Sequence, residues 1–285
     1  MSRDASPALP PGFKSYRLAF DWGRMHLVAG GQGEPLFMVH GLGGSCHDFL
    51  AMAPELARDH TLLIPDLPGF GYSDKPDLPY SPEFFAQVMT QTSERLGLKR
   101  AHWLGHSMGG QIAFTLGLER PELVRSVVAV CPAGGQDGAN GWQSFLQNVV
   151  ATKDDRFLFF CPCLVNLATR MCYGDPNHPS RAELTRRVRA QWEGPERPLL
   201  ERSLVRSGRA ILEQPVWPRL GKLQPPVLLV QGERDRVVAA VELQRIYSHL
   251  PPGARWEALP CGHMPVYTMA PELSAMVRGF LRGLA

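Results

Sequence analysis

Six short apolar runs, each ending in a loop, constrain the fold more strongly than any other feature of the sequence. The runs are LFMVH (36–40), TLLIPD (61–66), AHWLG (101–105), SVVAV (126–130), VLLVQG (227–232) and RWEAL (255–259). Continuous apolar runs of this length are typical of parallel strands that are covered on both faces. The sequence between the runs predicts helices at 47–58, 82–97, 108–119, 239–250 and 271–283. This alternation predicts an α/β fold with a doubly wound, mostly parallel sheet and ligands at the carboxyl ends of its strands.

Two parts of the chain depart from this alternation. Residues 16–20 and 24–29 flank the turn-like Asp21-Trp22-Gly23, which predicts an antiparallel hairpin. Between SVVAV and VLLVQG lies a segment that is too long for a simple crossover and rich in helical patterns. We therefore expect a core of residues 13–134 and 221–285, an inserted helical cap at 135–220, and a flexible tail at 1–12.

Composition excludes several classes of protein. The sequence is 44% hydrophobic and 20% charged, with a net charge of +3, which is too mild to indicate a nucleic-acid partner. The beginning MSRDASPALPPG has no apolar region, and no run reaches the roughly 18 apolar residues of a membrane span. The sequence therefore predicts a cytoplasmic monomer or homodimer without stable membrane insertion, whose six cysteines are reduced.

The segment GHSMGG (105–110) places a serine between glycines directly after an apolar run. A serine at a sharp strand-to-helix turn needs strained backbone, and larger side chains at Gly105 or Gly109 would collide with the neighbouring strand and helix. The turn exposes the Ser107 hydroxyl and points the first amides of the next helix toward the group that it attacks. Ser107 is therefore the predicted nucleophile.

A serine nucleophile needs a base and a carboxylate that orients the base. His263 follows the predicted strand RWEAL in the loop PCGHMP, and Asp235 follows VLLVQG in the loop GERD. Ser107, Asp235 and His263 stand in the chain order expected for this motif. Glu233 remains an alternative to Asp235, although it lies closer to the end of its strand.

The loop HGLGGS (40–45) is the second predicted source of oxyanion donors. Its glycines permit a tight turn, so that the Leu42 and Met108 amides would form the oxyanion hole. The rival interpretation is a dinucleotide-binding loop. It fails because Cys46 stands where the third glycine of that fingerprint belongs, and no suitable acidic residue follows.

Together these segments resemble the α/β-hydrolase family. HGLGGS, DLPGFGYSDKP (66–76), GHSMGG, the GERD loop and CGH stand in the order of the family's motifs. The resemblance implies a Ser107, Asp235 and His263 triad with the Leu42 and Met108 amides as oxyanion hole. In DLPGFGYSDKP it implies structural roles for Asp66 and Gly69.

Within this family the sequence is similar to serine enzymes with a helical cap. Haloalkane dehalogenases and epoxide hydrolases use an aspartate as nucleophile. Because this chain has Ser107 at that position, it does not match either class. Meta-cleavage product hydrolases usually carry glycine-proline in the oxyanion loop and asparagine before the serine, whereas this chain has Gly43-Gly44 and His106. These departures favour a carboxylesterase that acts through an acyl-enzyme. Carbon-carbon bond hydrolysis, acyl transfer and a receptor that turns over slowly remain the alternatives.

The predicted substrate is a small to medium hydrophobic ester, and no metal or other cofactor is expected. The most apolar stretch, residues 156–173, is interpreted as a wall of the cap that faces the substrate, with the core of the cap and a dimer surface as the alternatives. The arginines between 181 and 209 are interpreted as solvated helix faces, with an anionic substrate or acidic lipid surface as the alternative. The predicted substrate-binding residues are Gly41, His106, Phe159, Leu164, Val237 and Met264.

Overall fold

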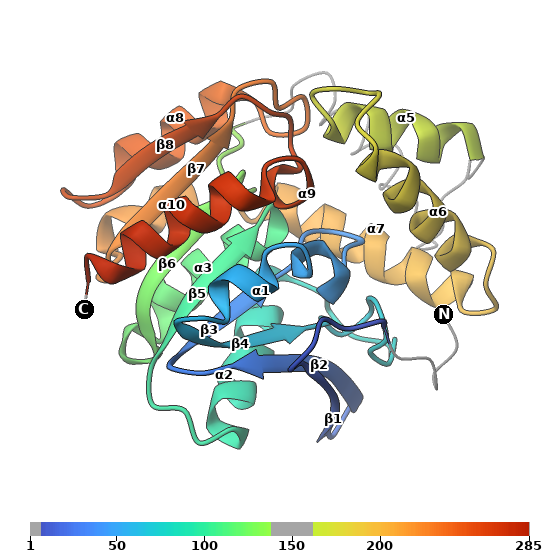
Figure 1. Cartoon of the computed structure of the whole chain (residues 1–285), viewed down its shortest axis with the longest axis horizontal. Coiled ribbons are helices and arrows are strands. Elements are labelled where there is room, and N and C mark those ends of the chain that lie inside the picture. Colours follow the sequence, from blue (N-terminus) through green and yellow to red (C-terminus); the bar gives the residue numbers. More distant parts are fainter. Residues whose placement is uncertain (1–6, 138–161, 285) are drawn as a thin grey trace.

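The computed structural model describes residues 7–137 and 162–284, and its centre is one eight-stranded sheet in the order β1-β2-β4-β3-β5-β6-β7-β8 (Figure 1). The strands are β1 (Lys14–Phe20), β2 (Gly23–Gly31), β3 (Glu34–Val39), β4 (His60–Pro65), β5 (Ala101–His106), β6 (Val124–Val130), β7 (Val227–Gly232) and β8 (Arg255–Leu259). The hairpin β1–β2 is antiparallel, and β2 also pairs antiparallel with β4. From β4 to β8 the strands are parallel, which confirms the predicted fold class.

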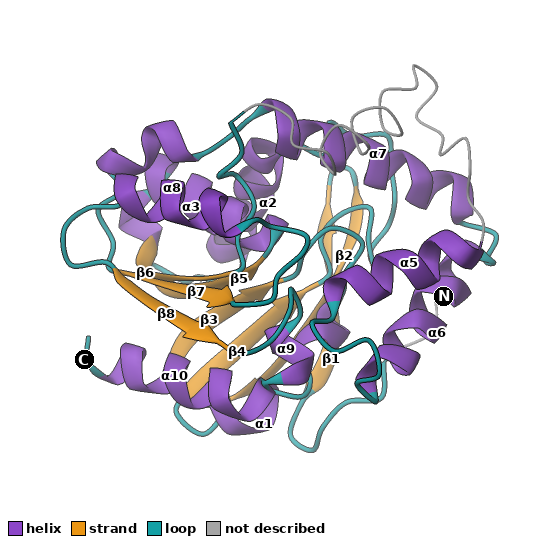
Figure 2. Ribbon diagram, turned by 90° about the horizontal axis from the view of Figure 1, so that it is seen from above, coloured by secondary structure: helices purple, strands orange, loops and turns teal. Residues whose placement is uncertain are grey.

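Both faces of the sheet are buried, which explains why its strands read as continuous apolar runs. In β3, Leu36 and Met38 belong to one core cluster, whereas Phe37 and Val39 belong to the other. Figure 2 shows α1 (Ala53–Leu56) and α10 (Ala270–Arg282) on one face of the sheet. The opposite face carries α2 (Pro82–Arg95), α3 (Met108–Glu119) and α8 (Ala240–His249).

Four of the five predicted helices are present within one or two residues of their expected ends. The expectation of one helix over 47–58 is wrong, because the chain forms a 3-10 helix η1 (Cys46–Phe49) and a separate short helix α1. Pro54 stands in the first turn of α1. A proline is tolerated in the first turn of a helix, but in the interior of a longer helix it would lack the backbone N–H that the helix needs.

Among the residues described between β6 and β7, where the sequence predicts the cap, are the α-helices α5 (Pro162–Cys172), α6 (Ser180–Trp192) and α7 (Arg197–Glu213). Figure 1 shows them lying together beside the sheet. They approach the loops that follow β3, β4 and β8, since added Cβ atoms on Gly43, Gly69 and Gly262 would meet Leu204, Ser203 and Gly174. We call α5, α6 and α7 the cap helices; a cap function, the boundaries 135–220 and the flexible tail stay predictions. None of the described helices has the length and apolar character of a membrane span.

Candidate active site

The predicted nucleophile stands at the junction of β5 and α3. Ser107 has φ 55° and ψ −118°, a conformation that non-glycine residues rarely adopt, and it is half-buried. A Cβ on Gly105 would lie 2.1 Å from the carbonyl oxygen of Gly109, and a Cβ on Gly109 would lie 2.0 Å from that of Val39. These distances confirm that crowding by the adjacent helix and strand requires glycine at both positions.

The loops after β7 and β8 bring Asp235 and His263 together. His263 Nδ1 lies 2.7 Å from Asp235 Oδ2, and the two side chains are 5% and 3% exposed. The other carboxylate oxygen, Oδ1, accepts hydrogen bonds from the amides of Val237 (2.8 Å) and Val238 (3.0 Å). Burial alone would raise the pKa of Asp235, but the His263 charge and these hydrogen bonds lower it below its ordinary value. Glu233, the alternative acid, is exposed.

His106 connects the nucleophile turn to the loop of the predicted base. Its Nε2–H donates to the backbone carbonyl of His263 at 2.7 Å, and the two imidazole rings are 4.9 Å apart. Burial, followed by repulsion from His263, lowers the pKa of His106 to about 3, so its ring is neutral at physiological pH. Within the described residues, the Ser107 hydroxyl makes no hydrogen bond to His263. Such bonds are often long in a protein without its substrate.

The loop after β3 has the tight backbone that the oxyanion hole requires. The Gly44 amide donates to the Gly41 carbonyl at 3.1 Å, and Gly43 has φ +71°. Among the residues that the structure describes, neither the Leu42 nor the Met108 amide donates a hydrogen bond to protein. Both amides are therefore available to a ligand.

The predicted substrate-binding residues fall into two groups. Gly41 and His106 adjoin Ser107: an added Cβ on Gly41 would lie 3.0 Å from the Ser107 Cβ. Met264 is buried beside His263, and Val237 is half-buried in the Asp235 loop. Phe159 lies outside the described residues, and Leu164 is described only as part of the α5 backbone.

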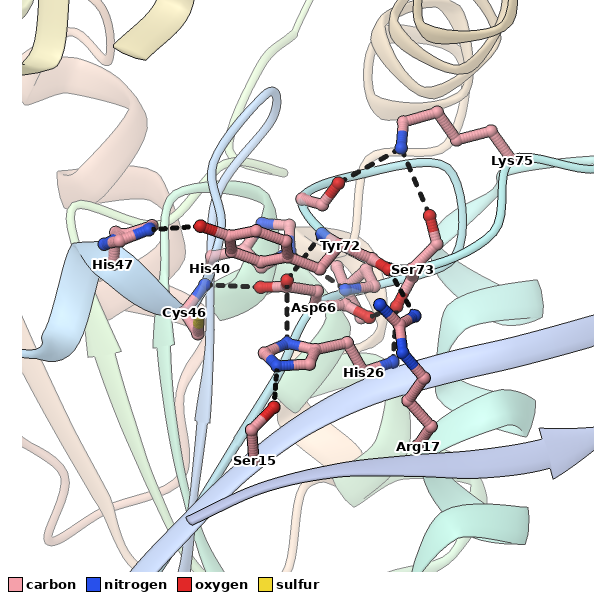
Figure 3. A network of polar contacts seen from close by, with 12 residues as sticks. Ser15, Arg17, His26, His40, Cys46, His47, Asp66, Tyr72, Ser73 and Lys75 are labelled. Atoms are coloured by element: carbon pink, nitrogen blue, oxygen red, sulfur yellow. Dashed lines mark hydrogen bonds and ion pairs between the residues drawn. The ribbon is translucent and has the colours of Figure 1, made fainter. Parts of the chain in front are cut away.

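A buried network beneath the oxyanion loop, drawn in Figure 3, contains residues that sequence reasoning missed. Asp66 is fully buried and accepts hydrogen bonds from the Cys46 amide (2.6 Å), the Tyr72 amide (2.7 Å) and His26 Nδ1 (3.0 Å). His40 Nδ1–H donates to the Gly41 carbonyl at 2.7 Å, while Nε2 accepts from the Leu67 amide at 3.0 Å. The network ties the oxyanion loop to the loop after β4. Sequence analysis assigned a structural role to Asp66 but missed His26 and His40; the polar His26 inside the apolar run MHLVA was a signal for the network.

Two groups in the described chain combine cysteine, histidine and aspartate side chains. In His26, Cys46 and Asp66, and again in Cys131, Asp235 and His263, the potential ligand atoms lie within 4.8 Å of one another. In each group, however, the carboxylate already accepts hydrogen bonds from the imidazole and from two backbone amides. The carboxylate of each group is therefore engaged in three hydrogen bonds within the protein.

Cap arginines make specific contacts with the core. Arg187 of α6 is 9% exposed, donates to the Tyr267 hydroxyl and lies over that ring, with its guanidinium carbon 5.3 Å from the centroid. The Tyr267 hydroxyl donates in turn to Asp48 Oδ1 at 2.6 Å. Arg206 pairs with Asp77 at 2.5 Å. The expectation of solvated arginines is therefore correct for Arg186, which is 71% exposed, and wrong for Arg187.

The elbow serine, the histidine–aspartate pair and the glycine loop all lie at the carboxyl ends of parallel strands, as in a hydrolase of the α/β class. A family model described as alpha/beta hydrolase fold matches residues 34–269, and the chain therefore belongs to this family of hydrolases.

Several known proteins are similar to this chain. The dihydrolipoyllysine-residue acetyltransferase component of the acetoin cleaving system of Cupriavidus necator is 30% identical over 89% of the chain, which spans only 65% of that protein's length. The 2-hydroxy-6-oxo-6-phenylhexa-2,4-dienoate hydrolase of Burkholderia cepacia is 26% identical over 90% of the chain and 91% of its own. The solved structure of a membrane phospholipase A is 25% identical, with a TM-score of 0.77 over 96% of the chain and 87% of its own.

Proposed function

We propose that this chain is a serine hydrolase that cleaves a carboxylic ester through an acyl-enzyme. The observation that carries the proposal is the 2.7 Å contact of His263 with Asp235, in a loop that His106 joins to the strained turn of Ser107. A neutral imidazole needs this carboxylate to hold its tautomer and to stabilise the imidazolium that forms during attack. The pKa of Asp235 is lowered, which keeps its carboxylate ionised for that role.

The reaction proceeds in two steps on these groups. His263 takes the Ser107 proton as the hydroxyl oxygen attacks the ester carbonyl, and the Leu42 and Met108 amides hold the oxyanion. His263 then returns the proton to the leaving alcohol, which departs and leaves an acyl group on Ser107. Water repeats the sequence and releases the acid. Each oxyanion donor lowers the barrier by about 3 kcal/mol in enzymes of this kind.

A hydrophobic substrate of small to medium size fits the surroundings of this site best. Leu204 of α7 lies beside the oxyanion loop, 3.2 Å from where a Cβ on Gly43 would stand, and Met264 follows the proposed base directly. The nearby cap cations are engaged elsewhere, since Arg187 contacts Tyr267 and Arg206 pairs with Asp77. Because the groups near the site are apolar, and because these arginines already bind partners in the core, an uncharged acyl group is favoured.

Hydrolysis of para-nitrophenyl esters from acetate to palmitate tests the proposal. We expect turnover by the wild-type protein, with an optimum at short or medium chains, and its loss in Ser107→Ala and His263→Ala. The His249→Ala variant, changed at an exposed histidine far along α8, is the matched control and should retain full activity. Turnover that survives Ser107→Ala would refute the proposed nucleophile.

Carbon-carbon bond hydrolysis is the second candidate, because the similarity to the Burkholderia cepacia hydrolase covers 90% of this chain and 91% of that enzyme. A dienoate substrate of that kind is coloured, so its cleavage is followed by loss of absorbance. If kcat/KM for the dienoate is higher than for any of the esters, carbon-carbon bond hydrolysis replaces ester hydrolysis as the proposed function. The opposite ratio would retain the esterase.

A further inference from the structure

The carboxylate of Asp235 has a neighbour that the proposed reaction does not use, the thiol of Cys131. Cys131 directly follows β6, which lies in the sheet between the strands that lead to Ser107 and Asp235. Its Sγ, a carboxylate oxygen of Asp235 and a ring nitrogen of His263 lie within 4.8 Å of one another. The Cys131 side chain is fully buried, so this contact is sheltered from water.

The backbone at Cys131 is strained. With φ 44°, Cys131 is one of three described non-glycine residues that have a positive φ, and Ser107 is another. Such a conformation costs about 1–3 kcal/mol for a residue with a side chain and persists where the surroundings enforce it. The Cys131 amide donates to the Val230 carbonyl at 2.8 Å, and the Val130 carbonyl accepts from Ser107 at 2.9 Å. The turn is thereby fixed to both β7 and the nucleophile elbow.

Hydrogen-bond accounting at Asp235 leaves room for one further donor. An ionised carboxylate offers about four acceptor positions. Three are filled, by the Val237 and Val238 amides and by His263 Nδ1. Burial raises the pKa of the Cys131 thiol well above its ordinary value, and the charge of Asp235 raises it further. The thiol therefore stays protonated and can donate.

We propose that Cys131 is a positioning residue: its thiol donates a hydrogen bond to Asp235 and holds the carboxylate in the orientation that His263 needs. This inference rests on the proposed serine-hydrolase function. Cys131 does not touch the substrate and acts only through Asp235. A hydrogen bond from the thiol also weakens the attraction between the Asp235 carboxylate and a protonated imidazole ring.

The test compares Cys131→Ala, which removes the donor, with Cys131→Ser, which replaces the thiol by a hydroxyl donor. The measurement is the rate at which a fluorophosphonate probe labels Ser107, because this rate reports activation of the nucleophile whichever ester is the substrate. Loss of a hydrogen bond to a charged group predicts about tenfold slower labelling in Cys131→Ala, with recovery in Cys131→Ser. The acidic limb of the pH profile should also move to higher pH in Cys131→Ala, because the unshared carboxylate holds the imidazolium proton more tightly.

Two further variants separate positioning from folding. Cys131→Gly also lacks the donor, but it relieves the positive φ, so it should fold and still label slowly. Val277→Ala truncates a fully buried side chain in α10, outside the candidate site. This matched control should lose stability in thermal melts while Ser107 is labelled at the wild-type rate.

The outcomes distinguish failure of the positioning role from failure of the proposed serine-hydrolase function. Wild-type labelling rates in Cys131→Ala and Cys131→Gly would overturn the positioning role and leave the serine hydrolase standing. Slow labelling in Cys131→Ser as well, or slowing in Val277→Ala to the same degree, would also overturn that role. Absence of labelling in the wild-type protein, or equal labelling of Ser107→Ala, would refute the proposed function itself.

Discussion

The turn at Ser107 requires glycine because there is no space for a side chain. We therefore expect replacement of glycine by alanine to destabilise the protein here and to stabilise it where space is open. A Cβ on Gly109 would lie 2.0 Å from the Val39 carbonyl oxygen, which belongs to the rigid backbone of β3. In α10, an added Cβ on Gly279 would meet no atom within 4 Å. The two glycines stand in helices, so they form a matched pair.

We predict that Gly109→Ala lowers the free energy of unfolding by at least about 3 kcal/mol, because backbone must move to admit the methyl group. The Gly279→Ala variant should raise the same quantity by about 1 kcal/mol through better helix propensity. Urea denaturation followed by circular dichroism measures both. Equal effects of the two substitutions would contradict the steric explanation.

His106 gives the protein a predictable response to acid. Its pKa is lowered to about 3 from an ordinary value of 6.5, chiefly by burial and then by His263. Between these values the unfolded chain binds a proton that the folded chain does not, so stability falls as pH falls through this window.

We predict that the free energy of unfolding of the wild type falls by about 2 kcal/mol more than that of His106→Gln when the pH is lowered from about 7 to about 5. Glutamine retains an amide donor for the His263 carbonyl. Urea denaturation at both pH values is the measurement, and His249→Gln at an exposed site is the control. A wild-type pH dependence in His106→Gln would show that another group is responsible.

At the scale of elements, polar contacts join the helices between β6 and β7 to the core. Tyr267 belongs to α9 (Pro265–Thr268), immediately after the His263 loop, and Asp48 belongs to η1, after the oxyanion loop. Because Arg187 reaches the Tyr267 hydroxyl from α6, one contact joins the cap to both loops of the candidate site. Movement of α6 is therefore coupled to these loops.

Tyr267→Phe tests this coupling, since phenylalanine retains the ring beneath Arg187 and removes only the hydroxyl. Loss of hydrogen bonds to two charged groups should destabilise the protein by about 1–3 kcal/mol. We also expect faster hydrogen exchange in α6. Arg186→Ala, which breaks an exposed pair with Glu183, is the control and should change stability by less than about 0.5 kcal/mol. Unchanged exchange in α6 of Tyr267→Phe would refute the coupling.

The strands and most core helices could be predicted from sequence because their signals are local. Both faces of β3 and β5 are buried, so apolar runs mark them without ambiguity. The polar contacts could not be predicted in this way. His26 meets Asp66 across 40 positions and Arg187 meets Tyr267 across 80. Such pairs depend on how separate elements pack together, which the periodicity of one segment does not encode.

For the molecule as a whole, the burial of its thiols provides a measure of folding. Cys46, Cys131 and Cys261 are all buried, and burial raises the pKa of Cys261 to about 11 and that of the half-buried Cys172 to about 12. Because the thiolate is the reactive form, alkylation of Cys261 by iodoacetamide should be at least about 100-fold slower in the folded protein than in urea. Mass spectrometry of the individual cysteines measures this ratio. Equal rates in both states would show that the carboxyl-terminal half opens readily.

The strand order also determines when the protein becomes active during synthesis. Ser107 follows β5 in the middle of the sheet, whereas His263 follows β8, which is the last strand in the chain and the edge of the sheet. A nascent chain therefore carries the proposed nucleophile before the proposed base has been synthesised. In the proposed mechanism, hydrolysis begins only after β8 has paired with β7, so activity would report that this edge of the sheet has formed.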